Sequence, residues 1–288
     1  MAAVGGNNNI VRFTYTGEDD IPDDVTHVFV DVTIILEGAF FEHPNIVEVI
    51  CHEDVEKIES FAFACCPSLR RVIMRGVKIA DLSAFNWCDA LEDVECGKLE
   101  IIGEEAFCHC KSLRSINLQS ARIVEEDAFY GCEALTDVKF CNKLERFDRG
   151  AFGSCSSLER IIVPLKDGMI TADNIFQRCT NLKRIDLVEG GELSETIAAL
   201  HMERWRNDMN EEITSIHQNL PNAPAGDRNN DGEKTQVIRR WIRSVRDKLI
   251  HYKAEHQRVL DVAGTTLVLA LPRDLVMNHV LSFLELPR

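Results

Sequence analysis

The chain has 288 residues, of which 45 % are apolar, and a formal net charge of −15. This length can hold one large or two ordinary domains with a substantial buried core. The longest apolar runs, such as LVLAL (267–271), are far shorter than the ~20 residues that span a bilayer. The opening MAAVGGNNN has neither the basic nor the apolar part of a signal peptide. We therefore expect a soluble, cytoplasmic protein that does not bind membranes.

Residues 1–20 form a polar lead-in that we expect to be flexible. The first strand-like segment is VTHVFVDVTI (25–34). It starts the repeated region, and we expect it to act as an N-terminal cap that shields the first repeat from water.

A repeat of 22 to 24 residues fills the next part of the chain. Each copy has a Phe, usually after Ala, then Cys three residues later, Leu at six and Val or Ile at nine. A period in the twenties is typical of a solenoid, whose repeats bury their apolar residues only against their neighbours. We predict a solenoid over residues 21–192, with a local distortion in repeat three, where Ala80 replaces a larger residue. The seven phenylalanines are Phe40, Phe63, Phe85, Phe107, Phe129, Phe152 and Phe176.

Eight of the eleven cysteines occupy two repeated positions, which predicts that they are buried core thiols. A zinc site would need paired ligands that close a tetrahedron. CysHisCys at 108–110 is the nearest candidate, but Cys110 belongs to the repeated column. We predict neither a metal site nor disulfides. The eight are Cys66, Cys88, Cys110, Cys132, Cys155 and Cys179 at the first position, and Cys51 and Cys96 at the second.

The residues around the ninth position of each repeat alternate like a β-strand. They predict a parallel strand ladder on one face, with tight turns or short helical arcs between Phe and Cys. Outward side chains of this ladder are the candidate partner-binding residues, because a solenoid presents them as a rigid, wide array. They are Arg71, Asp93, Glu95, Asn117, Asp137, Lys139, Arg160, Arg184 and Asp186, with Ile73, Ser115 and Ile162 between them.

The motif Ala-Phe-x-x-Cys-x-x-Leu resembles the BspA-like leucine-rich repeat over roughly residues 21–190. The resemblance implies an interaction scaffold with no shared catalytic residues. The stretch from Tyr15 to Ile34 and the segment HYKAEH (251–256) also look like diatom and other protist proteins of this type.

Residues 193–288 have a different composition and predict an α-helical region. Apolar periodicity indicates one amphipathic helix over 193–219 and a second over 234–262, joined by the polar linker 221–233. This arrangement predicts an antiparallel helical hairpin. LPRDLVMNHVLSFLEL (271–286) predicts one more short helix.

Charge is divided unevenly, because residues 1–192 hold 34 acidic and 19 basic side chains and the rest of the chain is neutral. The acidic repeats argue against nucleic-acid binding. The segment from Lys234 to Arg258 is basic, with eight basic and two acidic residues. Three alternatives stay open for it: packing inside the hairpin, docking on the acidic repeats of its own or a second copy, or binding calmodulin or a membrane surface.

Two further motifs are incomplete. DRNNDG (227–232) resembles the start of a calcium loop, but Ile238 stands where the bidentate Glu is needed. LPRDLVMNHVLSFLEL resembles the opening of an F-box, which would imply a ubiquitin-ligase adaptor, but an F-box is much longer.

No nucleophile–base motif, phosphate loop or metal-binding His pair is visible. We therefore predict a non-enzymatic scaffold that binds a protein partner and needs no cofactor. Self-association through the C-terminal helices is an open alternative. A ubiquitin-ligase adaptor and a surface adhesin are the alternative functions.

Overall fold

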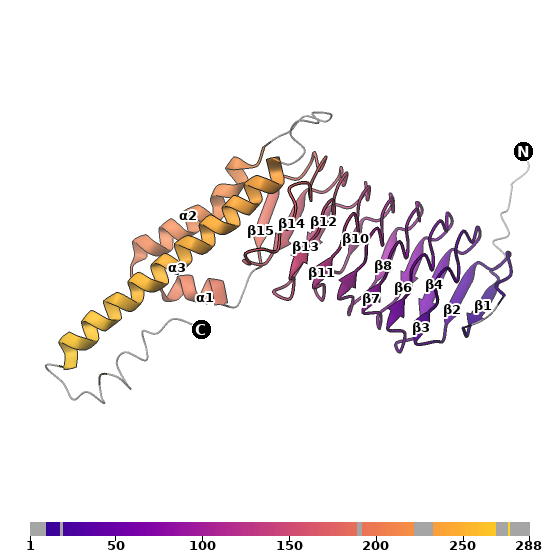
Figure 1. The fold of residues 1–288 in the computed structure, drawn as a ribbon, viewed down its shortest axis with the longest axis horizontal. Helices are drawn as coiled ribbons and strands as arrows, with labels where there is room; N and C mark the ends of the chain where they lie inside the picture. Colours follow the sequence, from indigo (N-terminus) through magenta and orange to yellow (C-terminus); the bar gives the residue numbers. More distant parts are fainter. Residues whose placement is uncertain (1–9, 18–19, 189–191, 222–232, 269–275, 277–288) are drawn as a thin grey trace, which may run out of the picture.

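The computed structural model describes residues 10–17, 20–188, 192–221, 233–268 and 276 (Figure 1). In this part of the chain, parallel strands form a solenoid, and three helices follow at its C-terminal end. The predicted fold class is therefore confirmed.

From β2 to β13, each turn of the solenoid adds one strand to a first face and one short strand to a second. The first face, called the strand-lined face below, consists of a six-stranded and a three-stranded parallel sheet. Its strands are β1 (Arg12–Tyr15), β2 (His27–Val30), β4 (Glu48–Cys51), β6 (Arg71–Ile73), β8 (Asp93–Glu95), β10 (Ser115–Ile116), β12 (Asp137–Lys139), β14 (Arg160–Val163) and β15 (Arg184–Leu187). The second face contains β3 (Ile34–Ile35), β5 (Lys57–Ile58), β7 (Ile79–Ala80), β9 (Ile101–Ile102), β11 (Ile123–Val124) and β13 (Arg146–Phe147).

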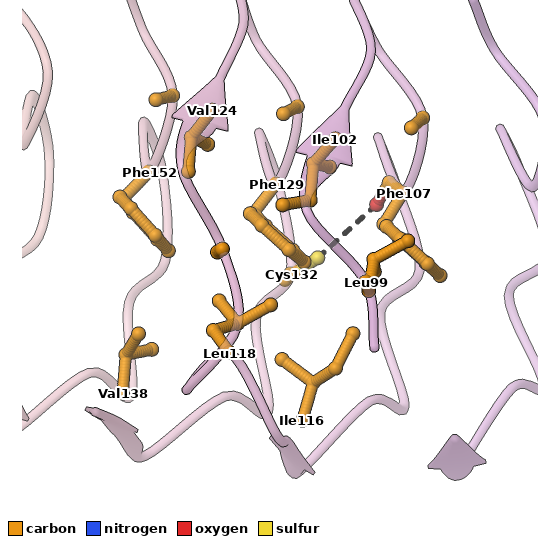
Figure 2. Close-up of a cluster of buried hydrophobic side chains, with 14 of the residues drawn as sticks. Leu99, Ile102, Phe107, Ile116, Leu118, Val124, Phe129, Cys132, Val138 and Phe152 are labelled. Atoms are coloured by element: carbon orange, nitrogen blue, oxygen red, sulfur yellow. Dashed lines mark hydrogen bonds between the residues drawn. The ribbon is translucent and has the colours of Figure 1, made fainter. Parts of the chain in front are cut away.

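A column of phenylalanines runs through the core between the two faces (Figure 2). From Phe40 to Phe152, neighbouring rings stack with centroids 4.7–5.4 Å apart and interplanar angles of 2–10°. Six cysteines line this column, and each thiol donates a hydrogen bond of 2.9–3.2 Å to a Phe carbonyl of the preceding repeat. Figure 2 shows the bond from Cys132 to Phe107. The predicted core column is confirmed, and the bond explains the preference for a small side chain with a donor.

The segment around each core Phe from Phe40 to Phe152 is a tight turn with two left-handed residues. Around Phe63, the backbone φ of both Phe61 and Cys65 is 58°. Their N–H groups donate to the carbonyls of Leu82 and Asn86 in the next repeat, at 2.9 and 2.7 Å. These bonds continue the inter-repeat ladder through the turn, so the segment is not a helical arc. Equivalent pairs are Ser83 and Trp87, and Glu105 and His109.

The solenoid begins earlier than the sequence predicted. Arg12–Tyr15 forms β1, which pairs in parallel with β2. Tyr15 is buried, and its ring packs edge-on against Phe40 with centroids 5.0 Å apart. These four residues therefore belong to the sheet and not to a flexible lead-in. Tyr15 occupies the end of the phenylalanine column, and β1 lies outside the segment predicted as the cap.

The distortion predicted in repeat three does not occur. Ala80 is fully buried and pairs in register with Ile58 on one side and Ile102 on the other. Backbone hydrogen bonds set the register of a strand ladder, so a smaller side chain leaves the pairing intact.

The helix predicted over 193–219 is divided into two helices with a break from Leu200 to Met202. No Gly or Pro lies at the break; one long-range contact with α3 and one local contact hold it instead. The N–H of His201 donates to Nδ1 of His256 at 3.0 Å, and Arg206 donates to the carbonyl of Leu200 at 2.5 Å. The three helices are α1 (Glu192–Ala199), α2 (Glu203–Asn219) and α3 (Glu233–Val268).

Helices α2 and α3 form the predicted antiparallel hairpin. In the second half of α2, the carbonyl of Glu212 accepts from Trp241 of α3 at 2.9 Å. Towards the start of α2, the ring of Trp205 stacks on that of Tyr252, with centroids 5.5 Å apart. Val259, predicted on the apolar side of the second helix, is exposed.

The N-terminal part of α3 caps the last repeat (Figure 1). The ammonium of Lys234 donates to the carbonyls of Cys179 and Leu182 at 2.7 and 3.2 Å. Arg239 pairs with Asp173 on the last turn of the solenoid. The basic segment from Lys234 to Arg258 therefore packs inside the hairpin and also docks on the acidic repeats of its own chain. Two of the three predicted alternatives thus hold together.

Candidate functional site

The strand-lined face presents two outward rows of side chains, set by the strand register. Every residue predicted as outward lies in one of them, and none is fully buried. The first row is Arg12, His27, Glu48, Arg71, Asp93, Ser115, Asp137, Arg160 and Arg184. The second row is Thr14, Phe29, Ile50, Ile73, Glu95, Asn117, Lys139, Ile162 and Asp186.

The charged residues predicted in the N-terminal half bind one another across the strands. Arg71 donates to Glu48 at 3.4 Å, to Asp93 at 3.1 Å and also to Glu95. A hydrogen bond from Arg75, at 2.7 Å, and a second from Arg71 lower the pKa of Glu95. The hydrogen bond to Glu95 likewise raises the pKa of Arg71. A partner would therefore meet a prearranged ion-pair network here and not isolated charges.

Three apolar side chains lie side by side in the second row, and we call them the apolar row. Phe29 pairs with Ile50 on the next strand, and Ile50 pairs with Ile73. Phe29 is 39 % exposed and Ile50 36 % exposed, and Ile73 is half-buried. Large apolar side chains grouped on a surface are typical of interaction sites.

The strand-lined face opens between β10 and β12, where no ladder pairing joins these two described strands. The Asn117 side chain accepts from the N–H of Gln119 at 3.1 Å, and the Asn117 carbonyl accepts from the Cys96 thiol at 3.3 Å. At the equivalent place two repeats on, the Ile162 carbonyl accepts from the N–H of Phe140 at 3.0 Å. The Ile162 bond joins β12 to β14, whereas the Asn117 contacts lie within its own turn and towards β8, so they do not bridge β10 and β12.

This opening forms a hollow of about 400 Å³. Ile116, Val138 and Ile162 line it among polar side chains. The hollow brings together four of the predicted partner-binding residues: Asn117, Asp137, Lys139 and Arg160. Its size suits a large side chain of a partner.

The C-terminal end of the face meets the helices at a cleft of about 680 Å³. Asp186 accepts from Arg160 at 2.5 Å and from Arg184 at 2.9 Å. His217 of α2 lies with Nε2 3.5 Å from the same carboxylate and 3.0 Å from the carbonyl of Ile185. The last two predicted residues, Arg184 and Asp186, therefore line a boundary with the helical region.

The structure describes some of the residues on which the metal-site, calcium-loop, F-box and membrane alternatives depend. Cys108 and Cys110 are buried, and burial raises the pKa of Cys108 to about 12. Among the described residues, no group of three or more His, Cys, Asp or Glu side chains is placed to hold a metal ion. DRNNDG and, apart from the buried Val276, the F-box-like segment lie outside the described residues. None of the described helices is both long and apolar enough to cross a bilayer.

The repeats match a family model described as "BspA type Leucine rich repeat region (6 copies)" over residues 25–123 and 100–198. These two overlapping matches cover more than half of the chain. The chain belongs to the BspA-type leucine-rich repeat family. The family resemblance read from the repeat motif is confirmed, while the diatom or protist type stays a prediction.

Several solved bacterial leucine-rich repeat proteins are similar to this BspA-type chain. One from Bacteroides ovatus has a TM-score of 0.45 and 22 % identity over 63 % of this chain and 43 % of its own. One from T. pallidum has a TM-score of 0.40 and 24 % identity over 55 % and 68 %. An internalin from Listeria monocytogenes has a TM-score of 0.34 and 15 % identity over 58 % and 56 %. This chain thus spans less than half of the Bacteroides ovatus protein. No curated protein matches the sequence.

The most apolar part of the strand-lined face was not predicted from the sequence of this BspA-type array. The predicted outward positions begin at Arg71 and leave out Phe29 and Ile50, which precede them in the second row. The alternation in VTHVFVDV and VEVI already placed both on the outward side of their strands. The opening at Asn117 and the cleft at α2 depend on contacts between repeats and had no comparable signal.

Proposed function

We propose that this protein is a non-enzymatic interaction module that binds a protein partner on the strand-lined face. The observation that carries the proposal is the apolar row, in which Phe29 and Ile50 are exposed on neighbouring strands. Burying such side chains against a partner contributes about 25 cal/mol per Å² of apolar surface.

The rigidity of the array supports the same proposal. Inter-repeat hydrogen bonds fix the strands and the turns, so the face loses little conformational freedom when it binds. Apolar side chains bounded by charged ones, with a hollow nearby, match the anatomy of protein interfaces, where a few buried anchors carry most of the binding energy.

Site-specific photo-crosslinking tests the proposal. A photoreactive residue would replace Ile73 or Lys139 on the strand-lined face, and in matched controls Ile79 or Arg146 on the second face. We expect the two variants of the strand-lined face to crosslink the same protein in native cells. Crosslinks of equal yield from both faces, or from the second face only, would overturn the proposal.

Location inside the cell is part of the proposal. Detection of the native protein at the cell surface would favour the adhesin alternative instead. The ubiquitin-ligase adaptor alternative depends on residues 271–286. It predicts co-purification with a cullin-linker protein that is lost when these residues are deleted.

A further inference from the structure

The N-terminal end of the solenoid combines exposed apolar side chains with a concentrated negative charge. Residues 10–60 hold 13 acidic and two basic side chains, whereas residues 61–192 hold 21 acidic and 17 basic. The exposed large apolar side chains of the described solenoid also gather there, with Trp87 as the exception. They are Ile10, Phe29, Ile34, Leu36, Phe41, Ile50 and Phe61.

The carboxylates at this end differ from those in the middle of the array in how they are neutralised. In the middle, basic side chains of neighbouring repeats pair with them, as Arg122 does with Glu100 and Glu145 at 3.6 and 2.8 Å. Among the described residues, the salt bridges include no partner for Asp31, Glu37, Glu42 or Glu53. The end of the solenoid therefore keeps an uncompensated negative field.

This field reaches the apolar row at its Phe29 end. Asp31 follows Phe29 by two residues and is exposed, and Glu48 precedes Ile50 by two residues on the same strand. Glu95 lies beside Ile73 on the next strand. Glu48 and Glu95 both pair with Arg71, so a ligand that covers the apolar row meets Asp31, which has no salt bridge among the described residues, beside Phe29, and ion-paired carboxylates towards Ile73.

We propose that the apolar row binds an amphipathic, basic helix of a partner protein, with apolar side chains on one side and Lys or Arg at its borders. This inference rests on the proposed function of the strand-lined face. Charge complementarity selects this occupant, because a surface rich in carboxylates repels anionic lipids, nucleic acids and acidic peptides. Because the centre of this surface is apolar, a peptide with basic side chains alone would leave the apolar row uncovered.

The spacing of the apolar row fits a helix that crosses the strands. Neighbouring strands lie about 4.8 Å apart, so Phe29, Ile50 and Ile73 span about 10 Å. Residues i, i+3 or i+4, and i+7 of a helix rise about 4.5–6 Å per step and about 10 Å in all. An extended peptide that crosses the strands places same-side residues about 6.6 Å apart and loses this register.

Binding of synthetic peptides tests the proposal on the full-length protein. The probe is a peptide of about 18 residues, long enough to form a helix, with Leu along one side and Lys elsewhere. One control peptide replaces Lys by Glu, and another replaces Leu by Ser. We expect the Leu–Lys peptide to bind at least about tenfold more tightly than either control, and its binding to weaken as NaCl rises.

Variants of the protein separate the site from non-specific attraction. Phe29→Ser with Ile50→Ser should weaken binding of the Leu–Lys peptide about tenfold or more. The matched control is Ile250→Ser on α3, where Ile250 is 57 % exposed, and it should leave binding unchanged. Asp31→Asn with Glu53→Gln should reduce the salt dependence, unlike Glu133→Gln with Glu159→Gln in the middle of the array. Circular dichroism checks that each variant is folded.

Equal peptide binding by the Phe29 and Ile50 variant and by the wild type would overturn this inference, as would equal binding of the Glu peptide. If photo-crosslinking still captures a partner from the strand-lined face, the proposed function survives that result. Loss of crosslinking from Ile73 and Lys139 would instead contradict the proposed function, whatever the peptides show.

Discussion

At the scale of single residues, the core cysteines act as hydrogen-bond donors as well as small apolar side chains. The thiol of Cys110 donates to the carbonyl of Phe85 at 3.2 Å. The same carbonyl accepts from the N–H of Cys88 in its own repeat at 3.2 Å. Each cysteine of the column thus joins two repeats, and burial raises the pKa of Cys110 well above its usual range, so it stays a thiol. Such a thiol is a poor nucleophile and a poor metal ligand.

The loss of stability on substitution of Cys110 should increase with the polarity of the new side chain. Cys110→Ala loses one hydrogen bond and should lower the free energy of unfolding by about 1 kcal/mol. Cys110→Asp buries a charge with no partner and should cost several kcal/mol, enough to disrupt the array. Urea unfolding followed by circular dichroism measures both. The control is Cys141→Asp at a partly exposed cysteine, and a Cys110→Asp protein as stable as that control would refute the buried-column interpretation.

At the scale of elements, α3 supplies the last repeat with hydrogen-bonding partners that a further repeat would otherwise provide. Lys234 donates to the carbonyls of Cys179 and Leu182 at 2.7 and 3.2 Å, and Thr235 accepts from the N–H of Phe176 at 3.3 Å. Solenoid ends need such caps because each repeat is stabilised only by its neighbours. Burial lowers the pKa of Lys234, because its ammonium is less well solvated at the C-terminal end of the solenoid than in water.

Removing these cap contacts should loosen the C-terminal repeats first. Lys234→Met combined with Thr235→Val keeps the helix but deletes its bonds to the last repeat. Hydrogen exchange followed by mass spectrometry should show faster exchange around Phe176–Leu187 and little change around Phe107–Ile116, because coupling passes only between adjacent repeats. Arg240→Ala, on the exposed side of α3, is the control. Uniformly faster exchange would mean that the array unfolds as one unit.

The α2–α3 hairpin should be sensitive to acid. Hydrogen bonds from Tyr252 and Lys248 lower the pKa of Asp208 on α2. The unfolded chain therefore takes up a proton more readily than the folded one as the pH falls through the ordinary Asp pKa of about 3.9. The stabilisation by Asp208 is complete above that pH and is lost as the pH falls through its lower folded-state pKa.

Asp208→Asn tests this linkage. Because Asp208 is partly exposed, the variant should lose no more than about 1 kcal/mol at pH 7. Its stability should decline less than that of the wild type between pH 5 and pH 3, so the two proteins converge in acid. Urea unfolding at a series of pH values gives both curves. Parallel curves would show that the carboxylate contributes nothing through its charge.

At the scale of the whole molecule, the features that recur in every repeat could be predicted from the sequence, whereas the contacts that occur only once could not. Periodicity identified the solenoid, the column around Phe107 and the outward rows, because each repeat poses the same local packing problem. The strand at Arg12–Tyr15 was missed because it is short and carries no core motif. The break at His201, the opening at Asn117 and the docking of Lys234 depend on residues far apart in the sequence, so no local pattern indicates them.

Native thiol titration tests the packing of the whole array in one experiment. Nine of the eleven cysteines are buried, and Cys65 and Cys141 are partly exposed. We expect two thiols to react with a soluble disulfide reagent in the native state, and all eleven in denaturant. Burial raises the pKa of Cys65, so its reaction should be slower than that of a free cysteine at pH 7 and should accelerate as the pH rises. A Cys65→Ser and Cys141→Ser variant should show no fast thiol, whereas rapid labelling of further thiols would show that the repeats open independently of one another.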